Sequence, residues 1–144
     1  MIDRFQWSGK WISPEEKIEP EVRKGAGYLR KTFTISSKED LLKGKNACLF
    51  ATAHGLYEVH LNGKRVGDAL LTPGCDEYNK RLQYQCYDVT SLLKEGENTI
   101  CVTLGDGWYR GCNGIDGVRN LFGDDLSFLG EISLLHDGTQ GESV

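Results

Sequence analysis

The stretch Leu56-Tyr57-Glu58-Val59-His60-Leu61-Asn62-Gly63-Lys64-Arg65-Val66 carries the strongest structural signal in this chain of 144 residues. Apolar or aromatic side chains alternate with polar ones as far as Leu61, which is the period of a half-buried β-strand. The Asn-Gly pair then predicts a two-residue hairpin turn with positive φ at both positions and a return arm over Lys64–Val66. We expect Leu56, Leu61 and either Tyr57 or Val59 to contribute to a core, with Glu58 and His60 solvated.

Other segments have the composition of short β-strands separated by turns. Residues 47–54 form a nearly continuous apolar run, typical of a central strand buried on both faces. One helical turn is predicted over residues 88–96, where Gly96 falls at the position of a left-handed stop. The remaining predicted strands are 28–35, 81–87, 99–104 and 128–135. About five to seven such strands imply an all-β fold, an antiparallel β-sandwich of the jelly-roll type.

The composition also divides the chain. Residues 1–26 hold Trp7 and Trp11 and are predicted to form an irregular arm packed on the domain by these tryptophans. Residues 27–144 are predicted to form one β-sandwich, because a chain of this length buries a single core. Asp137-Gly138 predicts another turn, but the residues after it are too polar and too few to complete a sheet. We therefore expect a sandwich truncated at its C-terminal end, cut from a longer protein.

Charge and cysteine content exclude several classes of function. The net charge is −4, and no run of five like charges occurs, so neither nucleic acid nor an anionic membrane is an expected partner. No apolar run is long enough for a bilayer and no signal peptide is visible, so the expected location is cytoplasmic unless an export signal has been lost. The 5 cysteines lack C-x-x-C spacing and are expected to be reduced thiols.

The segment Gly105-Asp106-Gly107-Trp108-Tyr109-Arg110-Gly111 follows a predicted strand and is expected to be a shaped loop. Aromatic rings can cover the apolar face of a sugar ring, while Asp106 and Arg110 can hydrogen-bond its hydroxyl groups. The same composition also suits a plug that closes the open end of a sandwich core, since large aromatic side chains are mostly buried. We assign the plug to Trp108 and any sugar contacts to Asp106, Tyr109, Arg110 and Arg119.

No catalytic or metal motif is complete. The chain contains no G-x-S-x-G, and His54, His60 and His136 are too scattered to pair, so we interpret them as structural or solvated. Acids between the last two predicted strands are most simply turn formers, although loop carboxylates can also bind calcium or, as an opposed pair, cleave a glycoside. These acids are Asp106, Asp116, Asp124 and Asp125. The sequence therefore predicts no metal site, with calcium kept as a possible cofactor.

Four motifs together carry a family resemblance. The Leu-Asn-Gly hairpin and the Tyr87-Asp88-Val89-Thr90 stretch with its later Gly-Glu-Asn are shared by many galactose-binding-like sandwiches attached to glycosidases. A more specific motif is the Gly105–Gly111 loop together with Arg119-Asn120-Leu121-Phe122-Gly123-Asp124, because fewer families share it. With these motifs, and with Leu71-Thr72-Pro73-Gly74-Cys75-Asp76-Glu77-Tyr78, roughly residues 28–138 closely resemble the N-terminal β-sandwich domain of bacterial α-L-rhamnosidases.

The resemblance implies a non-catalytic accessory domain. In that family the acids that cleave rhamnosides lie in a downstream (α/α)₆ barrel, and the reaction inverts the anomeric centre. The domain would then aid recognition of rhamnose-containing glycosides, or alternatively brace the barrel without binding sugar; a freestanding small glycosidase is the third hypothesis. The candidate carbohydrate-binding residues are Asp106, Trp108, Tyr109, Arg110, Arg119, Asn120 and Asp124.

Overall fold

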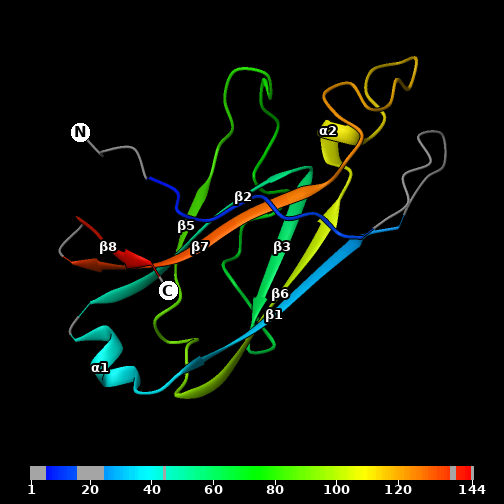
Figure 1. Cartoon of the computed structure of the whole chain (residues 1–144). Helices are drawn as coiled ribbons and strands as arrows, with labels where there is room; N and C mark the ends of the chain where they lie inside the picture. The colour runs from blue at the N-terminus through cyan, green and yellow to red at the C-terminus, as the bar shows by residue number, and fades with distance from the viewer. Residues whose placement is uncertain (1–5, 16–24, 44, 137–138, 144) are drawn as a thin grey trace.

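The computed structural model describes residues 6–15, 25–43, 45–136 and 139–143. Two four-stranded antiparallel sheets face each other in a sandwich (Figure 1). One sheet has the order β1-β6-β3-β4 and the other the order β5-β2-β7-β8. The elements are β1 (Gly27–Ile35), α1 (Lys38–Leu42), β2 (Asn46–His54), β3 (Leu56–Leu61), β4 (Lys64–Arg65), β5 (Gln85–Asp88), β6 (Gly96–Gly105), α2 (Gly107–Arg110), β7 (Ser127–His136) and β8 (Thr139–Ser143). The prediction of an all-β antiparallel sandwich is confirmed.

The β3–β4 hairpin forms as its sequence predicts. Asn62 and Gly63 have φ values of 52° and 80°, so both positions of the turn are left-handed. The Asn62 side chain also fixes the turn to its surroundings, because its Nδ2 donates to the carbonyl of Leu92 and to Oδ1 of the fully buried Asn98. The turn residue therefore joins this end of the hairpin to the segment that precedes β6.

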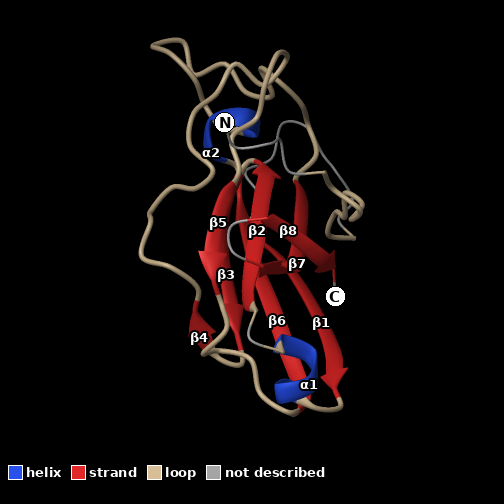
Figure 2. Cartoon of the chain, turned by 90° about the vertical axis from the view of Figure 1, so that its left-hand side faces the viewer, coloured by secondary structure: helices blue, strands red, loops and turns tan. Residues whose placement is uncertain are grey.

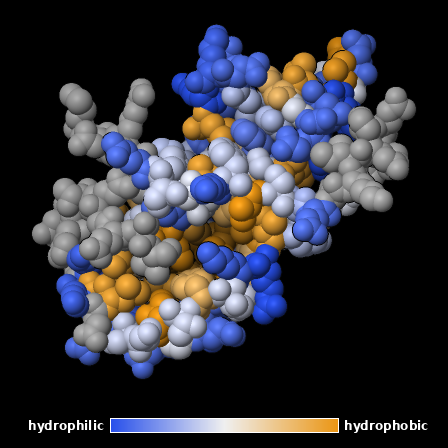
Figure 3. All heavy atoms as spheres, viewed as in Figure 1, coloured by the Kyte–Doolittle hydropathy of each residue, from blue (hydrophilic) through white to orange (hydrophobic). Residues whose placement is uncertain are grey.

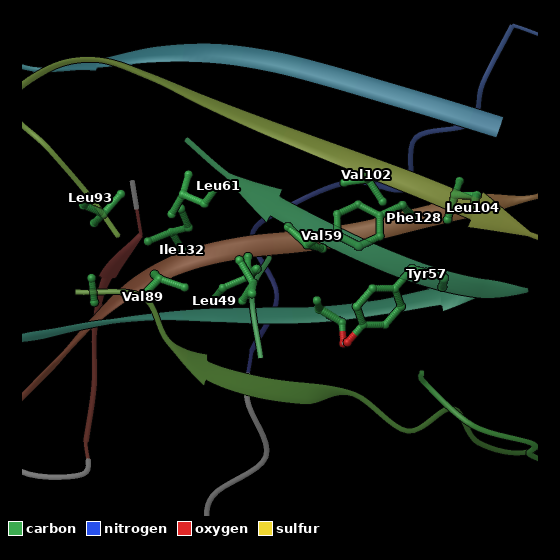
Figure 4. Packing of buried hydrophobic residues seen from close by; sticks show 14 of the residues in the cluster. Leu49, Tyr57, Val59, Leu61, Val89, Leu93, Val102, Leu104, Phe128 and Ile132 are labelled. Carbon is green, nitrogen blue, oxygen red and sulfur yellow. The ribbon is translucent and has the colours of Figure 1, made fainter. Parts of the chain in front are cut away.

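The core lies between the two sheets, where the inward faces of β2, β3, β6 and β7 meet (Figure 4). On β3 the buried side chains are Tyr57, Val59 and Leu61, while Leu56 is only half-buried. The expectation that Leu56 belongs to this core is therefore wrong, because alternation along the strand turns the odd-numbered residues inward. Leu56 instead packs beneath Gly107, where an added Cβ would lie 2.6 Å from the Leu56 Cγ.

Three further segments differ from the sequence predictions. Residues 81–84 are outside β5, because the Gln83 N–H donates to the buried Asp76 carboxylate at 2.7 Å instead of to a strand. The segment 139–143, expected not to complete a sheet, pairs with β7 as β8. The Gly105–Gly111 segment is not wholly loop, since Gly107–Arg110 make one helical turn. The turn predicted before Gly96 is present, with Leu93 N–H bonded to the Val89 carbonyl and a Gly96 φ of 83°.

The first described residues lie across the outer face of the β2–β7 sheet. The Glu131 carboxylate accepts hydrogen bonds from the backbone N–H groups of Ser8 and Gly9 at 2.8 and 3.0 Å. Trp7 meets Tyr84 edge-on, with ring centroids 5.8 Å apart. The Glu131 carboxylate and the Trp7–Tyr84 contact, together with the backbone hydrogen bonds that Ile12 exchanges with Phe128, thus hold this segment on the sheet.

Acid is expected to weaken this attachment. Burial alone would raise the pKa of Glu131, but hydrogen bonds from Gly9 and Ser8 offset it, so the pKa lies below its ordinary value. The stabilisation from Glu131 is therefore complete above the unfolded-state pKa and is lost as the pH falls through the lower folded-state pKa. At pH 7 the free energy of unfolding of the Glu131→Gln variant is expected to be about 1–2 kcal/mol lower than that of wild type. Urea unfolding of both proteins should show this difference shrinking below about pH 4, and a difference independent of pH would contradict the assignment.

Candidate functional site

The candidate residues gather at one end of the sandwich. Strand β6 ends at Gly105, α2 follows at once, and residues 111–126 return to β7. Figure 2 shows α2 and the neighbouring long loops beyond the ends of the sheets, opposite the end that carries α1. Each candidate side chain is therefore placed by a strand end or by a loop anchored to one.

Two glycines allow α2 to form so close to the sheet. Gly107 has a φ of 53°, and a Cβ there would collide with the Leu56 side chain. Gly111 donates its N–H to the Gly107 carbonyl at 3.1 Å, and a Cβ on it would meet that same carbonyl oxygen. The Gly-x-x-x-Gly spacing thus creates a single tight turn that points three large side chains in different directions.

Asp106 binds two arginines with its two carboxylate oxygens. Oδ1 accepts from Arg110 Nε at 2.8 Å, and Oδ2 accepts from Arg119 Nη2 at 2.6 Å. The Arg110 side chain is 5% exposed, so this charge is almost fully removed from water. Arg119 also donates to Cys112 Sγ at 3.4 Å. Because one carboxylate serves residues on both sides of the loop, it fixes residues 112–119 against α2.

Aromatic rings from α2 and four other segments form a continuous column. Trp11 stacks on His54 with ring centroids 4.3 Å apart, and His54 stacks on Tyr109 at 4.7 Å. Tyr109 then meets Tyr78 edge-on at 5.2 Å, and Tyr78 contacts Phe122 at 4.9 Å. We call these five residues the ring column. It joins the N-terminal segment, the end of β2, the loop before β5 and the loop before β7.

His54 is the second member of this column, between Trp11 and Tyr109. Its Nδ1 is 2.9 Å from Ser127 Oγ, which fixes the ring plane. Burial lowers the pKa of His54, and the more distant Asp125 opposes this only in part. The imidazole is therefore neutral near pH 7, so it packs between two aromatic rings without the cost of burying a charge.

The structure brings most of the predicted site residues together, but largely in contacts within the domain. Tyr109 and Arg110 are buried, at 8% and 4% exposure, while Trp108 is half-buried. Asn120 has a φ of 57° and donates its N–H to the Arg110 carbonyl. Asp124 is exposed, and its carbonyl oxygen lies 3.5 Å from Arg110 Nη1. The polar residues of this set thus hold the loop in place.

Sequence reasoning missed three members of the column as site residues, namely His54, Tyr78 and Phe122, and assigned Trp11 only to the arm. His54, Tyr78 and Phe122 all fall inside the stretch that carries the family resemblance, which was the available signal. The stacking of His54 itself could not be predicted from its neighbours, because its two stacking partners lie far away along the chain.

The tip of the loop after α2 presents apolar side chains to solvent. Asn113 and Val118 exchange backbone hydrogen bonds around a turn that contains Ile115 and Asp116. Ile115 is fully exposed, and Val118 and Leu121 are 51% and 56% exposed. We call Ile115, Val118 and Leu121 the apolar tip. Three exposed aliphatic side chains within seven positions are typical of a surface that contacts another protein surface.

The described residues contain neither a metal-binding cluster nor a membrane-spanning helix. No three His, Cys, Asp or Glu side chains of that set come together in a position to hold a metal ion. Nor does any helix in the described ranges have the length and hydropathy needed to cross a membrane. None of the 5 cysteines lies in a disulfide in this structure.

Comparison with known proteins agrees with this geometry. Residues 43–144 match the family described as the α-L-rhamnosidase N-terminal domain. An α-L-rhamnosidase of Streptomyces avermitilis is 41% identical over 127 residues, which cover 88% of this chain and 12% of that protein. The crystal structure of native α-L-rhamnosidase from Aspergillus terreus superposes with a TM-score of 0.82 at 36% identity, covering 95% of this chain and 15% of that one.

The Streptomyces avermitilis enzyme complexed with L-rhamnose superposes with a TM-score of 0.69 at 40% identity, over 81% of this chain and 11% of the other. The chain thus spans about 12% of the length of the curated relatives it matches. The matched residues include β2 to β8 and the loop that follows α2, but not β1. The chain belongs to the family of α-L-rhamnosidase N-terminal domains.

Proposed function

We propose that this domain braces the rest of a longer α-L-rhamnosidase and performs no chemistry itself. The observation that carries the proposal is the state of the loop around α2. Tyr109 and Phe122 are engaged in the ring column, and Arg110 and Arg119 in the double ion pair of Asp106, while the apolar tip projects outward. A loop that is rigid inside and apolar outside suits contact with a neighbouring protein surface.

The apolar tip provides the test of this proposal. Ile115→Asp is expected to change the free energy of unfolding of the isolated chain by less than about 0.5 kcal/mol, because Ile115 is fully exposed there. In the longer rhamnosidase the same substitution is expected to cost about 1–2 kcal/mol, since it places a charge in an apolar contact. Thermal unfolding of both proteins measures the difference.

Ser91→Asp is the matched control for this substitution. It adds the same charge at an exposed position before β6, at the end of the sandwich opposite α2. We expect it to be neutral in both proteins. If Ile115→Asp is also neutral in the longer protein, the brace proposal is wrong.

Recognition of rhamnose-containing glycosides is the second candidate function. Two aromatic side chains at this end favour it, because Trp11 is 41% exposed and Trp108 is only half-buried. An exposed indole face can stack on the apolar side of a sugar ring. The two candidates make opposite predictions for the response of these indoles to an added rhamnoside.

Neither candidate assigns hydrolysis to this chain. Glycoside cleavage needs two carboxyl groups that flank the scissile bond, and both oxygens of Asp106 are bound by arginines. The isolated chain is expected to release no measurable aglycone from an aryl α-L-rhamnoside, whereas the longer protein releases it. Turnover by the purified chain that disappears in Asp106→Asn or Asp124→Asn would show that this assignment is wrong.

A further inference from the structure

A large apolar groove opens along one edge of the sandwich, away from α2. It has a volume of about 580 Å³ and lies between β1 and β7. Its apolar lining comes from both sheets and from Ile12 of the N-terminal segment; the lining residues of the sheets are Leu29, Phe33, Leu49, Ile100, Val102, Phe128 and Ile132. Figure 3 shows hydrophobic atoms at the bottom of a hollow in the region where Figure 1 places these two strands. The groove thus leads from the surface into the core.

The backbone beside the groove offers hydrogen bonds as well as apolar surface. β1 is the outermost strand of its sheet, with β6 as its hydrogen-bonded neighbour on the inner side. On the outer edge of β7, the backbone partners found among the described residues are Ile12, opposite Phe128, and β8, from Ser133 onward. The stretch from Leu129 to Ile132 lies between these two contacts. Among the residues that the structure describes, no strand pairs with the outer edge of β1, and a strand edge of this kind next to apolar side chains is a template for another strand.

The charges around the opening narrow the choice of occupant. Lys10, Arg30 and Lys31 line it and carry positive charge. The acid at the opening, Glu131, already accepts hydrogen bonds from Ser8 and Gly9. The rim therefore favours a segment with apolar residues in its middle and an acidic residue at its end.

We infer that an extended apolar strand from the remainder of the longer polypeptide occupies this groove and pairs with β1. A small apolar molecule would fill the volume but leave the β1 edge unpaired, whereas a strand satisfies both. The curated relatives supply the length for such a segment, since this chain covers only 12% of each of the first three. This inference rests on the brace proposal and adds to the apolar tip a second contact, at the β1–β7 edge.

Hydrogen exchange measured by mass spectrometry tests the inference, with the isolated chain compared with the longer rhamnosidase. Residues 27–35 are expected to exchange at least about tenfold more slowly in the longer protein, because their outer amide groups become paired. Residues 56–61 lie inside a sheet and serve as the internal control, with no change expected. If residues 111–126 are slowed and 27–35 are not, the groove inference is wrong and the brace proposal stands. If neither segment is slowed, both are wrong.

A pair of substitutions in the longer protein gives an independent readout. Leu29→Asp places a charge in the groove, while Thr32→Asp places the same charge on an exposed position of the same strand. Leu29→Asp is expected to restore fast exchange over residues 27–35, and Thr32→Asp is expected to leave it slow. Equal behaviour of the two variants would overturn the inference.

Discussion

Replacing Tyr109 by alanine is expected to lower the free energy of unfolding by about 3–4 kcal/mol, the range for a large buried aromatic side chain. Tyr109 is 8% exposed and stacks on His54, and its edge-on contact with Tyr78 joins two loops. A Cβ at Gly123 would collide with its hydroxyl oxygen, so the loop before β7 packs closely against this ring. Removing the ring leaves a cavity at the centre of the ring column.

Trp108→Ala is the informative comparison for this variant. Trp108 is the neighbouring residue on α2 but is only half-buried, so its truncation is expected to cost about 1 kcal/mol. Tyr28→Ala, at a side chain that is 73% exposed, controls for the loss of an aromatic residue as such. Urea unfolding followed by circular dichroism ranks the three. A cost for Trp108→Ala equal to or above that for Tyr109→Ala would mean that Trp108 is the plug.

Asp106→Ala is expected to cost about 2–3 kcal/mol, because it removes the carboxylate that both arginines share. Most of the cost comes from Arg110. Its side chain is only 5% exposed, so its guanidinium stays buried after it has lost its charged acceptor. Asp106 itself is 21% exposed, which keeps the expected value below that of a fully buried pair.

Glu58→Ala is the matched control for Asp106→Ala. Glu58 bonds Arg65 at the same distance of 2.8 Å, but the two side chains are 44% and 33% exposed. Its removal is expected to lower the free energy of unfolding by less than about 1 kcal/mol. This cost is expected to shrink further in about 0.5 M salt, as it does for surface ion pairs. If the two variants are equally destabilised and equally sensitive to salt, then the Asp106 pair contributes no more than a surface salt bridge.

The sequence predicts those parts of this fold that depend on neighbouring residues. The β3–β4 hairpin is determined by Asn62 and Gly63, and the apolar run of β2 by burial on both faces, so both predictions are confirmed. Strand β5 is shorter than predicted because a distant carboxylate, Asp76, takes the Gln83 N–H. A pattern of side chains indicates which secondary structure a segment favours. It does not show that an acceptor in another loop competes for one of the segment's backbone N–H groups.

The candidate site shows the same limit more strongly. The glycines and aromatics of residues 105–111 identify the segment, and the family resemblance adds Arg119 and Asn120. The direction of each side chain is a different matter, because it follows from the close approach of Gly107 to Leu56. The ring column depends on contacts between residues as far apart as Trp11, His54 and Tyr109. Such contacts follow from topology, which no local window of the sequence contains.

Titration of the isolated chain with methyl α-L-rhamnopyranoside tests most directly whether the α2 end is a brace or a sugar site. The indole N–H signals of Trp11 and Trp108 report on the two partly exposed indole rings at the α2 end. The brace account predicts no saturable shift of either signal up to about 20 mM ligand. Any binding would then have a Kd well above about 1 mM. A saturable shift of either signal with a Kd of about 1 mM or lower would contradict the account and establish rhamnoside recognition at this end of the domain.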